Sequence, residues 1–263
     1  MKIVVIGGTG LIGSKVVEIL GGQGHQAIAA APNTGVDTIT GAGLADALAG
    51  ADAVVDVSNS PSLDGQVALE FFQTAGRNIA AAETAARVRH HVALSVVGTE
   101  RLSDSPYLRA KLAQEALIKA SPIPYTLVHA AQFFEFLRGI AQSATMGDTV
   151  RLPHARFQPM AARDVAAAVA AAALAPPANG MIEIGGPDIF RMDELVARVL
   201  DHDRDPRKVI ADPEARYFGA RLDDTSLLPG VGARLGATSF DWWLENVPPP
   251  PVKPATPPQP VHA

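Results

Sequence analysis

Short apolar runs alternate with amphipathic segments of helix length along the first half of the chain. Five runs are almost wholly apolar, as expected of strands in a parallel sheet that helices cover on both faces. They span residues 3–6, 27–31, 53–57, 92–97 and 126–129. Helical periodicity marks residues 11–20, 43–48, 64–87 and 107–119 between them. This order predicts an α/β fold: a Rossmann-type, doubly wound parallel sheet with right-handed crossovers.

The pattern changes after residue 128. Residues 132–143 and the alanine-rich segment 163–174 are helical in pattern, residues 181–184 form a short apolar run, and residues 192–200 are again helical. We predict that these elements build a small α/β substrate lobe over the carboxyl edge of the sheet. The expected domain is residues 1–247, with the lobe mainly from about 132–160 and 178–247.

Two further expectations concern glycine and proline. Gly76 lies inside the long helical segment 64–87 and is predicted to mark a bend. Residues 248–263 begin with four consecutive prolines and contain little that a core would bury. We predict a disordered, proline-rich tail there.

Composition excludes several kinds of chemistry. The chain has a net charge of −5 and no basic cluster, which argues against a nucleic-acid partner. It has no cysteine, which rules out disulfides, a thiolate nucleophile and a cysteine-bound metal. The apolar run that precedes the first glycines is too short for a signal peptide or a membrane span. We therefore expect a soluble cytoplasmic protein with no membrane partner and no metal; its oligomeric state stays open.

A glycine-rich turn connects the first predicted strand to the first helix. Its sequence, GGTGLIG, fits either Gly8-x-Gly10-x-x-Gly13 or Gly7-x-x-Gly10-x-x-Gly13. Glycine permits the tight turn, and its missing side chain lets backbone N–H groups approach a pyrophosphate at the helix N-terminus. The strand before and the helix after the turn supply the context that this motif requires. We expect a nicotinamide dinucleotide here.

The residue that reads the adenosine ribose usually lies about twenty positions beyond the last glycine. That position is Asn33, in the turn Ala31-Pro32-Asn33-Thr34. It offers neither a carboxylate for the ribose hydroxyls nor an arginine for a 2′-phosphate, whereas Asn33 and Thr34 offer hydrogen bonds to either form. We expect NADP, with NAD as the alternative and only a mild preference.

A tyrosine and a lysine lie four residues apart on one predicted helix. Tyr107 and Lys111 therefore share a face, and Ser95 lies near the end of the preceding strand. A carbonyl reductase needs a proton donor for the developing alkoxide. Lowering a tyrosine pKa from about 10 by about three units requires roughly 4 kcal/mol, for which the lysine and a cationic nicotinamide ring are suitable sources. We expect Tyr107 as general acid, Lys111 as its electrostatic partner and Ser95 as the carbonyl anchor.

These motifs together resemble the short-chain dehydrogenase/reductase superfamily. The stretch Leu94-Ser95-Val96-Val97-Gly98, the helix from Tyr107 through Lys111 to Glu115, the segment 124–127 and the run 132–136 resemble its atypical, NmrA-like branch, over about residues 1–245. The resemblance implies that the glycine loop holds the pyrophosphate. The residues carried over for this role are Gly7, Gly10, Leu11, Ile12 and Gly13.

The same resemblance implies further contacts to the cofactor. The segment after the third strand passes its ribose, here Ser58, Asn59 and Ser60, and Lys111 also contacts it. The branch often has an arginine and a proline after the fifth strand, where this chain has His129-Ala130-Ala131. The local cofactor contacts are therefore expected to differ from those of the branch.

Several aromatic residues have a structural interpretation beside a functional one. Phe133 and Phe134 are candidates for the lining of a substrate pocket, but aromatic side chains that pack against the sheet give the same pattern. Trp242 and Trp243 are expected to close the last helix and to fasten the small lobe.

Three ionisable residues are assigned structural positions. His90 and His91 precede a strand with no ligand at metal spacing, so they are expected in a solvated loop. Asp164 is expected in the first turn of a helix, where an acidic residue suits the helix dipole.

Three functions share these motifs. The first is an NAD(P)-dependent oxidoreductase that transfers a hydride to a small carbonyl, quinone or enone. The second is a non-catalytic, redox-sensing regulator of the NmrA type that binds the dinucleotide. The third is an NAD(P)-dependent epimerase or isomerase. The set Ser95, Tyr107 and Lys111 favours the first, because a sensor does not need a proton donor.

Overall fold

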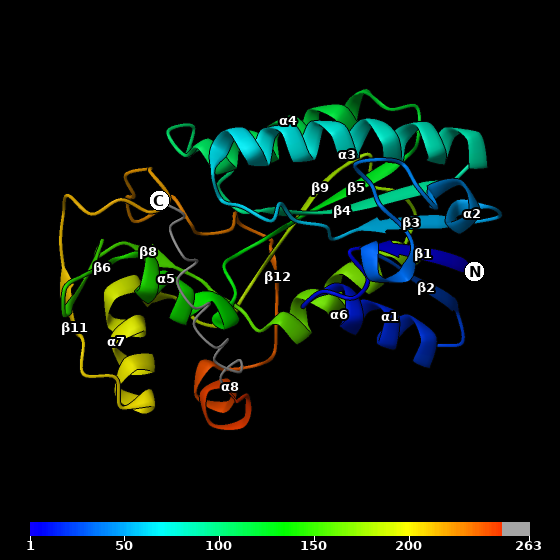
Figure 1. Ribbon diagram of the computed structural model, residues 1–263. Helices are drawn as coiled ribbons and strands as arrows, with labels where there is room; N and C mark the ends of the chain where they lie inside the picture. The colour runs from blue at the N-terminus through cyan, green and yellow to red at the C-terminus, as the bar shows by residue number, and fades with distance from the viewer. Residues whose placement is uncertain (249–263) are drawn as a thin grey trace, which may run out of the picture.

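The computed structural model describes residues 1–248 and contains a seven-stranded sheet in which each strand is parallel to its neighbours (Figure 1). The strand order is β12-β9-β5-β4-β3-β1-β2. The strands are β1 (Lys2–Ile6), β2 (Gln26–Ala30), β3 (Ala53–Asp56), β4 (His90–Val96), β5 (Tyr125–Ala130), β9 (Gly180–Gly185) and β12 (Arg234–Leu235). The predicted Rossmann-type α/β fold is confirmed.

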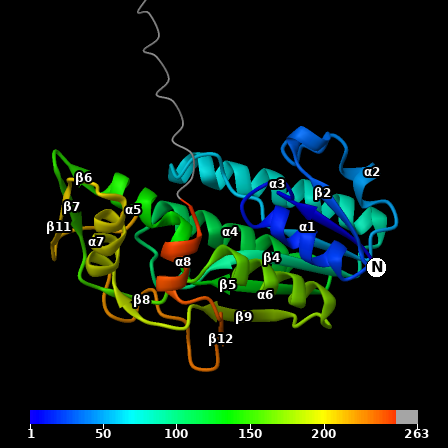
Figure 2. The same ribbon diagram turned by 90° about the horizontal axis from the view of Figure 1, so that it is seen from below.

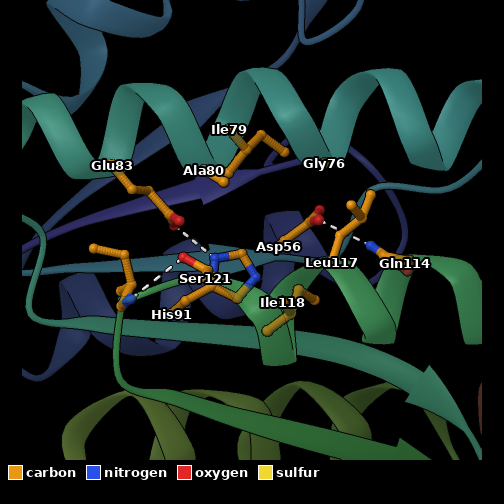
Figure 3. Close-up of a pocket in the computed structure, with 11 residues that line it drawn as sticks. Asp56, Gly76, Ile79, Ala80, Glu83, His91, Gln114, Leu117, Ile118 and Ser121 are labelled. Atoms are coloured by element: carbon orange, nitrogen blue, oxygen red, sulfur yellow. Dashed lines mark hydrogen bonds and ion pairs between the residues drawn. The ribbon is translucent and has the colours of Figure 1, made fainter.

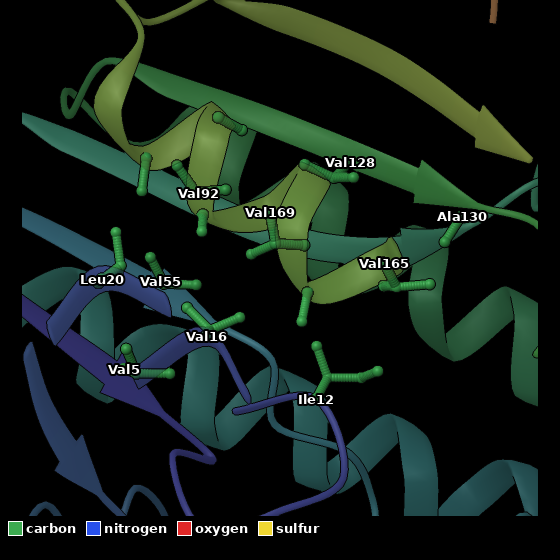
Figure 4. Packing of buried hydrophobic residues seen from close by; sticks show 14 of the residues in the cluster. Val5, Ile12, Val16, Leu20, Val55, Val92, Val128, Ala130, Val165 and Val169 are labelled. Carbon is green, nitrogen blue, oxygen red and sulfur yellow. The ribbon is translucent and has the colours of Figure 1, made fainter. Parts of the chain in front are cut away.

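Helices cover both faces of this sheet. On one face lie α3 (Gly65–Ala86) and α4 (Pro106–Ala120), with the short α2 (Leu44–Leu48) beside α3. On the other face lie α1 (Gly13–Gly22) and α6 (Ala162–Leu174), which pack on each other and on the strands. Figure 4 shows the core of this second face, in which Val16 of α1 and Val169 of α6 lie among strand valines such as Val55 and are fully buried. Burial of apolar side chains of this size stabilises the fold by about 1.5–3 kcal/mol each.

The remaining elements form a lobe beside the carboxyl ends of the strands (Figure 2). Its helices are α5 (Leu137–Ser143), α7 (Met192–Asp203) and α8 (Phe240–Asn246), and its small sheets consist of β6 (Thr145–Met146), β7 (Thr149–Leu152) and β11 (Lys208–Ala211), and of β8 (Arg156–Phe157) and β10 (Phe190–Arg191). The lobe has its own core, in which Phe134, Phe157, Phe240 and Trp243 are buried.

The order of the strands reverses between β1 and β3. The chain passes from β1 to β2 on one side and then returns to β3 on the other side of β1. In open α/β sheets, ligands bind beyond the carboxyl ends of the strands at such a point. Here the glycine loop follows β1, and the segment that begins at Ser58 follows β3.

Parts of the expected lobe belong to the main body instead. The run 181–184 lies within β9, which pairs with β5 in the central sheet, and α6 packs against α1. The predicted helix 132–143 was wrong at its start, because the chain remains extended at Phe133 and passes through a 3₁₀ turn, η2 (Phe134–Phe136), before α5 begins.

Two other expectations were wrong for packing reasons. Gly76 marks no bend, because α3 is continuous from residue 65 to 86; a Cβ at Gly76 would lie 3.1 Å from a methyl carbon of Leu117, so the glycine permits close approach of α3 and α4. His90 and His91 do not lie in a solvated loop. Both begin β4, and each is 4% exposed.

The predicted tail at 248–263 falls almost wholly outside the described residues, apart from Pro248. Among the helices of residues 1–248, none is both long and apolar enough to cross a membrane.

Candidate functional site

The glycine loop turns from β1 into α1 with backbone approaches that only glycine permits. Gly7 has a φ of 76°, and a Cβ there would lie 3.0 Å from the Ser58 Cα. A Cβ at Gly13 would lie 2.1 Å from the Gly7 carbonyl oxygen. Gly10 is exposed, and a Cβ there would meet the same oxygen at 3.2 Å. Gly7 and Gly13 therefore shape the turn, whereas Gly10 keeps its outer side open.

Unpaired backbone donors lie at the same place. Within the described chain, no carbonyl accepts from the backbone N–H groups of Leu11, Ile12 or Gly13, which precede or begin α1. Leu11 is 40% exposed, while the Ile12 side chain is buried in the core and anchors the loop from below. Free N–H groups and the positive end of the helix dipole form an arrangement that suits a pyrophosphate.

The turn after β2 is joined to the glycine loop by a side-chain hydrogen bond. Thr9 Oγ1 donates to Asn33 Oδ1 over 3.0 Å, and Asn33 is exposed. The Thr34 hydroxyl is engaged within its own turn, because it accepts from Ala31 N at 2.9 Å and lies 3.0 Å from Ala29 O. Of the two residues expected to meet the ribose, Asn33 is therefore the better placed.

The start of α4 places the tyrosine. Ser105 caps the helix by accepting from Leu108 N, and Pro106 occupies the first helical position, so Tyr107 lies in the first turn. Its hydroxyl donates to Asn59 Oδ1 over 2.8 Å. Burial raises the pKa of Tyr107 to about 12, although the Asn59 hydrogen bond acts in the opposite direction. The decrease in the Tyr107 pKa that we expected assumed a bound nicotinamide ring. In the protein alone burial dominates, so Tyr107 keeps its proton at neutral pH and can act as a donor.

Lys111 lies one helical turn further on and is 3% exposed. Its ammonium donates to Leu94 O over 3.0 Å and to Gln114 Oε1, and lies 4.5 Å from the centre of the Phe72 ring. Burial lowers the pKa of Lys111 to about 8, while the carboxylates of Asp56 and Glu115 act to raise it. A buried ammonium with these acceptors is held in one place.

Ser95 does not join the tyrosine and lysine. It is 3% exposed, and its hydroxyl donates to Glu115 Oε1 over 2.5 Å, between β4 and α4. The same carboxylate oxygen lies 3.0 Å from His129 Nε2. Burial acts to raise the pKa of Glu115, but the nearby His129 ring and the Ser95 hydrogen bond outweigh it and lower the pKa to about 2. The three side chains form a buried polar cluster.

The aromatic candidates divide between core and surface. Phe134 is fully buried and packs on Phe240 and Trp243, with ring centroids 5.4 Å away in each case. Phe133 is 8% exposed and stacks on Phe136, which is 49% exposed. Phe134 therefore lies in the core of the lobe rather than against the sheet, while the stacked pair offers an accessible aromatic surface.

The carboxyl-terminal tryptophans have different environments. Trp243 is buried in the lobe core and donates from Nε1 to Glu135 over 3.0 Å, which confirms its expected role as a fastening residue. Trp242 is 44% exposed and lies beneath the Arg163 guanidinium. Asp164 lies in the first turn of α6, as expected, and accepts from Thr238 N and Oγ1 at 2.8 and 3.0 Å.

Sequence reasoning missed three residues of this region. Asp56 is a single carboxylate at the end of an apolar strand, and Gln114 follows Lys111 by three positions on the same helix face; both patterns are signals in the sequence. Tyr217 is different, because it lies in an irregular loop without periodicity. Its pKa is raised by burial and by the nearby Tyr107 phenol. That loop reaches the start of α4, where a Cβ at Gly219 would lie 3.4 Å from a Pro106 ring carbon.

The fold and this site define a class: an α/β protein with a dinucleotide-type glycine loop and a Tyr–Lys helix at the carboxyl edge of its sheet. Residues 7–176 match the NAD(P)H-binding family model. The chain belongs to this NAD(P)H-binding family.

Two known proteins are similar to the chain in sequence. The chain is 29% identical over 216 residues to the (4-alkanoyl-5-oxo-2,5-dihydrofuran-3-yl)methyl phosphate reductase of Streptomyces griseus, covering 75% of this chain and 72% of that protein. It is 27% identical over 153 residues to the photosystem II assembly factor Ycf39 of Cyanophora paradoxa, and spans 48% of that protein.

Solved structures of low sequence identity share the fold. A short-chain dehydrogenase/reductase superfamily protein of Agrobacterium tumefaciens with bound NAD has a TM-score of 0.68 at 19% identity, covering 93% of this chain and 95% of that one. The triphenylmethane reductase of Citrobacter sp. complexed with NADP(H) has a TM-score of 0.60 at 22% identity, covering 82% and 80%. The expected resemblance is confirmed as far as an NAD(P)H-binding protein whose fold is shared with a short-chain dehydrogenase/reductase; the NmrA-like branch stays a prediction.

Proposed function

We propose that the protein is an NAD(P)H-dependent oxidoreductase that reduces a small carbonyl, quinone or enone. The observation that carries the proposal is the position of Tyr107 and Lys111 on one helix at the carboxyl edge of the sheet. Tyr107 bonds to Asn59 in the segment after β3, and the glycine loop packs on Ser58 of that segment. The Streptomyces relative, whose name describes a small-molecule reductase, supports this choice over a regulator.

The residues of the loop suit the cofactor. The open side of Gly10 and the free N–H groups of Leu11, Ile12 and Gly13 would hold the pyrophosphate, and Asn33 would meet the adenosine ribose. The reduced dinucleotide, when bound, supplies a hydride to the substrate carbon. Either NAD or NADP fits this description, with a mild preference for NADP proposed.

Tyr107 would donate its phenolic proton to the substrate oxygen as negative charge develops there. Its raised pKa keeps the proton in place until a stronger base appears, and the developing alkoxide is such a base. Asn59 orients the hydroxyl before the reaction. Lys111 would stabilise the resulting phenolate and contact the nicotinamide ribose, so its charge matters for both binding and chemistry.

Ser95 receives a different role from the one expected. A carbonyl anchor must present its hydroxyl to the substrate, whereas the Ser95 hydroxyl is buried and donates its hydrogen bond to Glu115. We propose that Ser95 holds Glu115, which in turn fastens α4 to the sheet. The exposed face of the Phe133 and Phe136 pair is proposed as an apolar contact for the substrate.

The test is a substrate screen with NADPH and with NADH. Oxidation of the reduced nicotinamide in the presence of a quinone, enone or carbonyl, with a reduced product identified by mass spectrometry, is the expected result. Conversion of a substrate without net cofactor oxidation would instead identify an epimerase or isomerase. Tight cofactor binding without any turnover across a broad panel would favour the redox-sensing regulator.

A further inference from the structure

A buried chain of polar side chains lies behind Lys111, on the face of the sheet that α3 and α4 cover. Gln114 accepts from the Lys111 ammonium with Oε1 and donates with Nε2 to Asp56 Oδ2 over 2.9 Å. Asp56 is 3% exposed, and its other carboxylate oxygen accepts from the backbone N and the hydroxyl of Ser58, at 2.9 and 2.6 Å. Hydrogen bonds therefore hold this chain of side chains at Lys111 and at Asp56.

A buried ion pair lies close by. His91 Nδ1 and Glu83 Oε1 are 2.6 Å apart, and their side chains are 6% and 2% exposed. Burial acts most strongly and lowers the pKa of His91, but the carboxylates of Glu83 and Asp56 together raise it above its ordinary value. A protonated imidazole has two N–H donors, and Glu83 accepts from one of them.

The other ring nitrogen of His91, Nε2, is buried and has no hydrogen-bond partner in the described residues. In Figure 3 this nitrogen points away from Glu83, toward the side on which Asp56 and Gln114 lie. A buried polar nitrogen without a partner is destabilising, whether it carries a proton or not, since it has lost its hydration without gaining a hydrogen bond.

A cavity of about 10 Å³ lies between the two groups, lined by Asp56, Glu83, His91 and Gln114 together with apolar residues of α3 and α4. This is about the room that one water molecule requires, and a buried water is stable when two to four polar groups surround it. Five of the lining side chains carry such groups, these four and Ser121. The cavity therefore has the size and the polarity of a single-water site.

We propose that this cavity binds one ordered water, which bonds to His91 Nε2 and to the Asp56 carboxylate, and that Gln114 is a positioning residue that joins this assembly to Lys111. The completed chain runs from Glu83 through His91, the water, Asp56 and Gln114 to the ammonium. It connects α3, β4, β3 and α4 and fixes the place and the charge of Lys111. This proposal rests on the proposed function only because Lys111 belongs to the proposed site.

Charged and polar groups surround both ends of this chain of side chains, Lys111 and His91. Lys111 faces Asp56 of β3, Glu115 and Tyr107 of its own helix, the ring of Phe72 of α3 and the carbonyl of Leu94 of β4. The charged or titratable groups near His91 are Glu83, Asp56 and its chain neighbour His90. The cavity is also lined by Gln114, Leu117 and Ile118 of α4 and by Ser121 just after it, none of which titrates.

The water is tested by a high-resolution crystal structure of the full chain without cofactor. We expect a water with about 2.7–3.2 Å to His91 Nε2 and to an Asp56 carboxylate oxygen. A dry cavity, or a direct hydrogen bond between His91 and Asp56, would overturn this part of the proposal.

The role of Gln114 is tested by the pKa of the Lys111 ammonium, measured by NMR on selectively labelled protein. Gln114→Leu removes an acceptor from the charged form, so we expect the pKa to fall by roughly one unit, a tenfold change in proton affinity. Gln114→Glu places a carboxylate there and is expected to raise it. The control is Gln66→Leu, the same change at an exposed position of α3, which should leave it unchanged.

An unchanged Lys111 pKa in folded Gln114→Leu protein would show that Gln114 only fills space. If that variant does not fold, Asp56→Asn keeps the shape and removes the charge at the far end of Gln114; it is expected to lower the Lys111 pKa, and no change would overturn the chain. Neither measurement needs a substrate, so its outcome is independent of whether the proposed reduction occurs.

Discussion

Tyr107 donates its phenolic hydrogen to Asn59 Oδ1 over 2.8 Å, which joins helix α4 to the segment after β3. The same oxygen of Asn59 accepts from Ser60 N over 2.9 Å, so the acceptor is itself held by the backbone. Gly7 packs against Ser58 in the same segment. The position of the phenol is therefore tied to the glycine loop, and the proposed acid and the proposed cofactor site are parts of one arrangement.

The phenol provides the first prediction. Tyr107→Phe keeps the ring but removes the proton, so the rate of substrate reduction is expected to fall by about 10²–10⁴, the usual contribution of a positioned acid. Cofactor affinity should hardly change. Steady-state kinetics and calorimetry measure the two effects. Tyr125→Phe, a half-buried tyrosine at the start of β5, is the matched control. A turnover within about threefold of the parent in Tyr107→Phe would exclude this tyrosine as the acid.

The second prediction separates binding from folding at the glycine loop. Gly10→Val adds a branched side chain where the pyrophosphate would lie, and should weaken dinucleotide binding more than tenfold, or by over about 1.4 kcal/mol. The fold should survive, because the outer side of Gly10 is exposed.

Gly21→Val is the control for this substitution, since a Cβ at Gly21 in α1 meets nothing within 4 Å among the described residues. Circular dichroism establishes that both variants fold, and calorimetry measures their affinity. Parent-like affinity in folded Gly10→Val protein would place the dinucleotide elsewhere.

The third prediction concerns the choice between NAD and NADP. The exposed Asn33 neither repels nor clamps a 2′-phosphate, so the two affinities should differ by about 1–2 kcal/mol at most. Asn33→Arg adds a cation at an exposed site, where screening limits the gain to about 1 kcal/mol, and should favour NADP by roughly fivefold. Parallel titrations of both cofactors measure this. A thousandfold preference of the parent for one of the two cofactors would show that a residue other than Asn33 recognises the 2′-position, with Lys15 of α1 as the first candidate.

Five of the seven strands of the main sheet could be predicted from the sequence, because they are continuous apolar runs; β12 could not, since Arg234–Leu235 is short and exposed. The strands of the lobe could not be predicted, since they are two to four residues long and too short to show an alternation of apolar and polar residues. The apolar run 181–184 was recognised but placed in the lobe, because nothing local shows that it pairs with β5 across fifty residues of chain. Tertiary pairing of this kind is set by the whole sheet.

The site was predicted in part for a similar reason. Tyr107 and Lys111 are related by helical spacing, which the sequence shows directly. Ser95 is a different case: a strand alternates its side chains between two faces, and which face meets α4 depends on packing. The burial of His91 was missed because its partner Glu83 lies on another element. A pair of histidines at a strand start looks like a solvated turn until that partner is known.

The fourth prediction follows from the depressed pKa of Glu115. The folded-state pKa is about 2 against an ordinary 4.5, so this carboxylate stabilises the fold above about pH 4.5 and loses that effect as the pH falls toward 2. The loss is limited to about 1.36 kcal/mol per pH unit for a single proton.

Urea unfolding at several acidic pH values measures this contribution. Glu115→Gln should be less stable than the parent near neutral pH, with a shallower loss of stability in acid. Glu18→Gln, at an exposed position of α1, should behave like the parent. A Glu115→Gln protein with parent-like stability and acid dependence would contradict the assignment of Ser95, Glu115 and His129 as a stabilising cluster.

The last prediction uses the charge of Lys111. Burial lowers its pKa to about 8, so the side chain is a cation below that pH and neutral above it. If the ammonium contacts the nicotinamide ribose and the phenol, dinucleotide affinity should decline as the pH rises past about 8, because the charged hydrogen bond is lost. Such a bond contributes about 1.5–3 kcal/mol, or roughly tenfold or more in affinity.

Lys111→Met keeps the length of the side chain and removes the charge. It should weaken dinucleotide binding at neutral pH and abolish the decline above about pH 8, while reduction of substrate falls together with affinity. Lys119→Met, two turns along the same helix and 44% exposed at the side chain, is the matched control and should retain the parent's pH dependence. Calorimetric titrations across this pH range measure both. A Lys111→Met protein that keeps the decline would assign it to another group and remove Lys111 from the cofactor site.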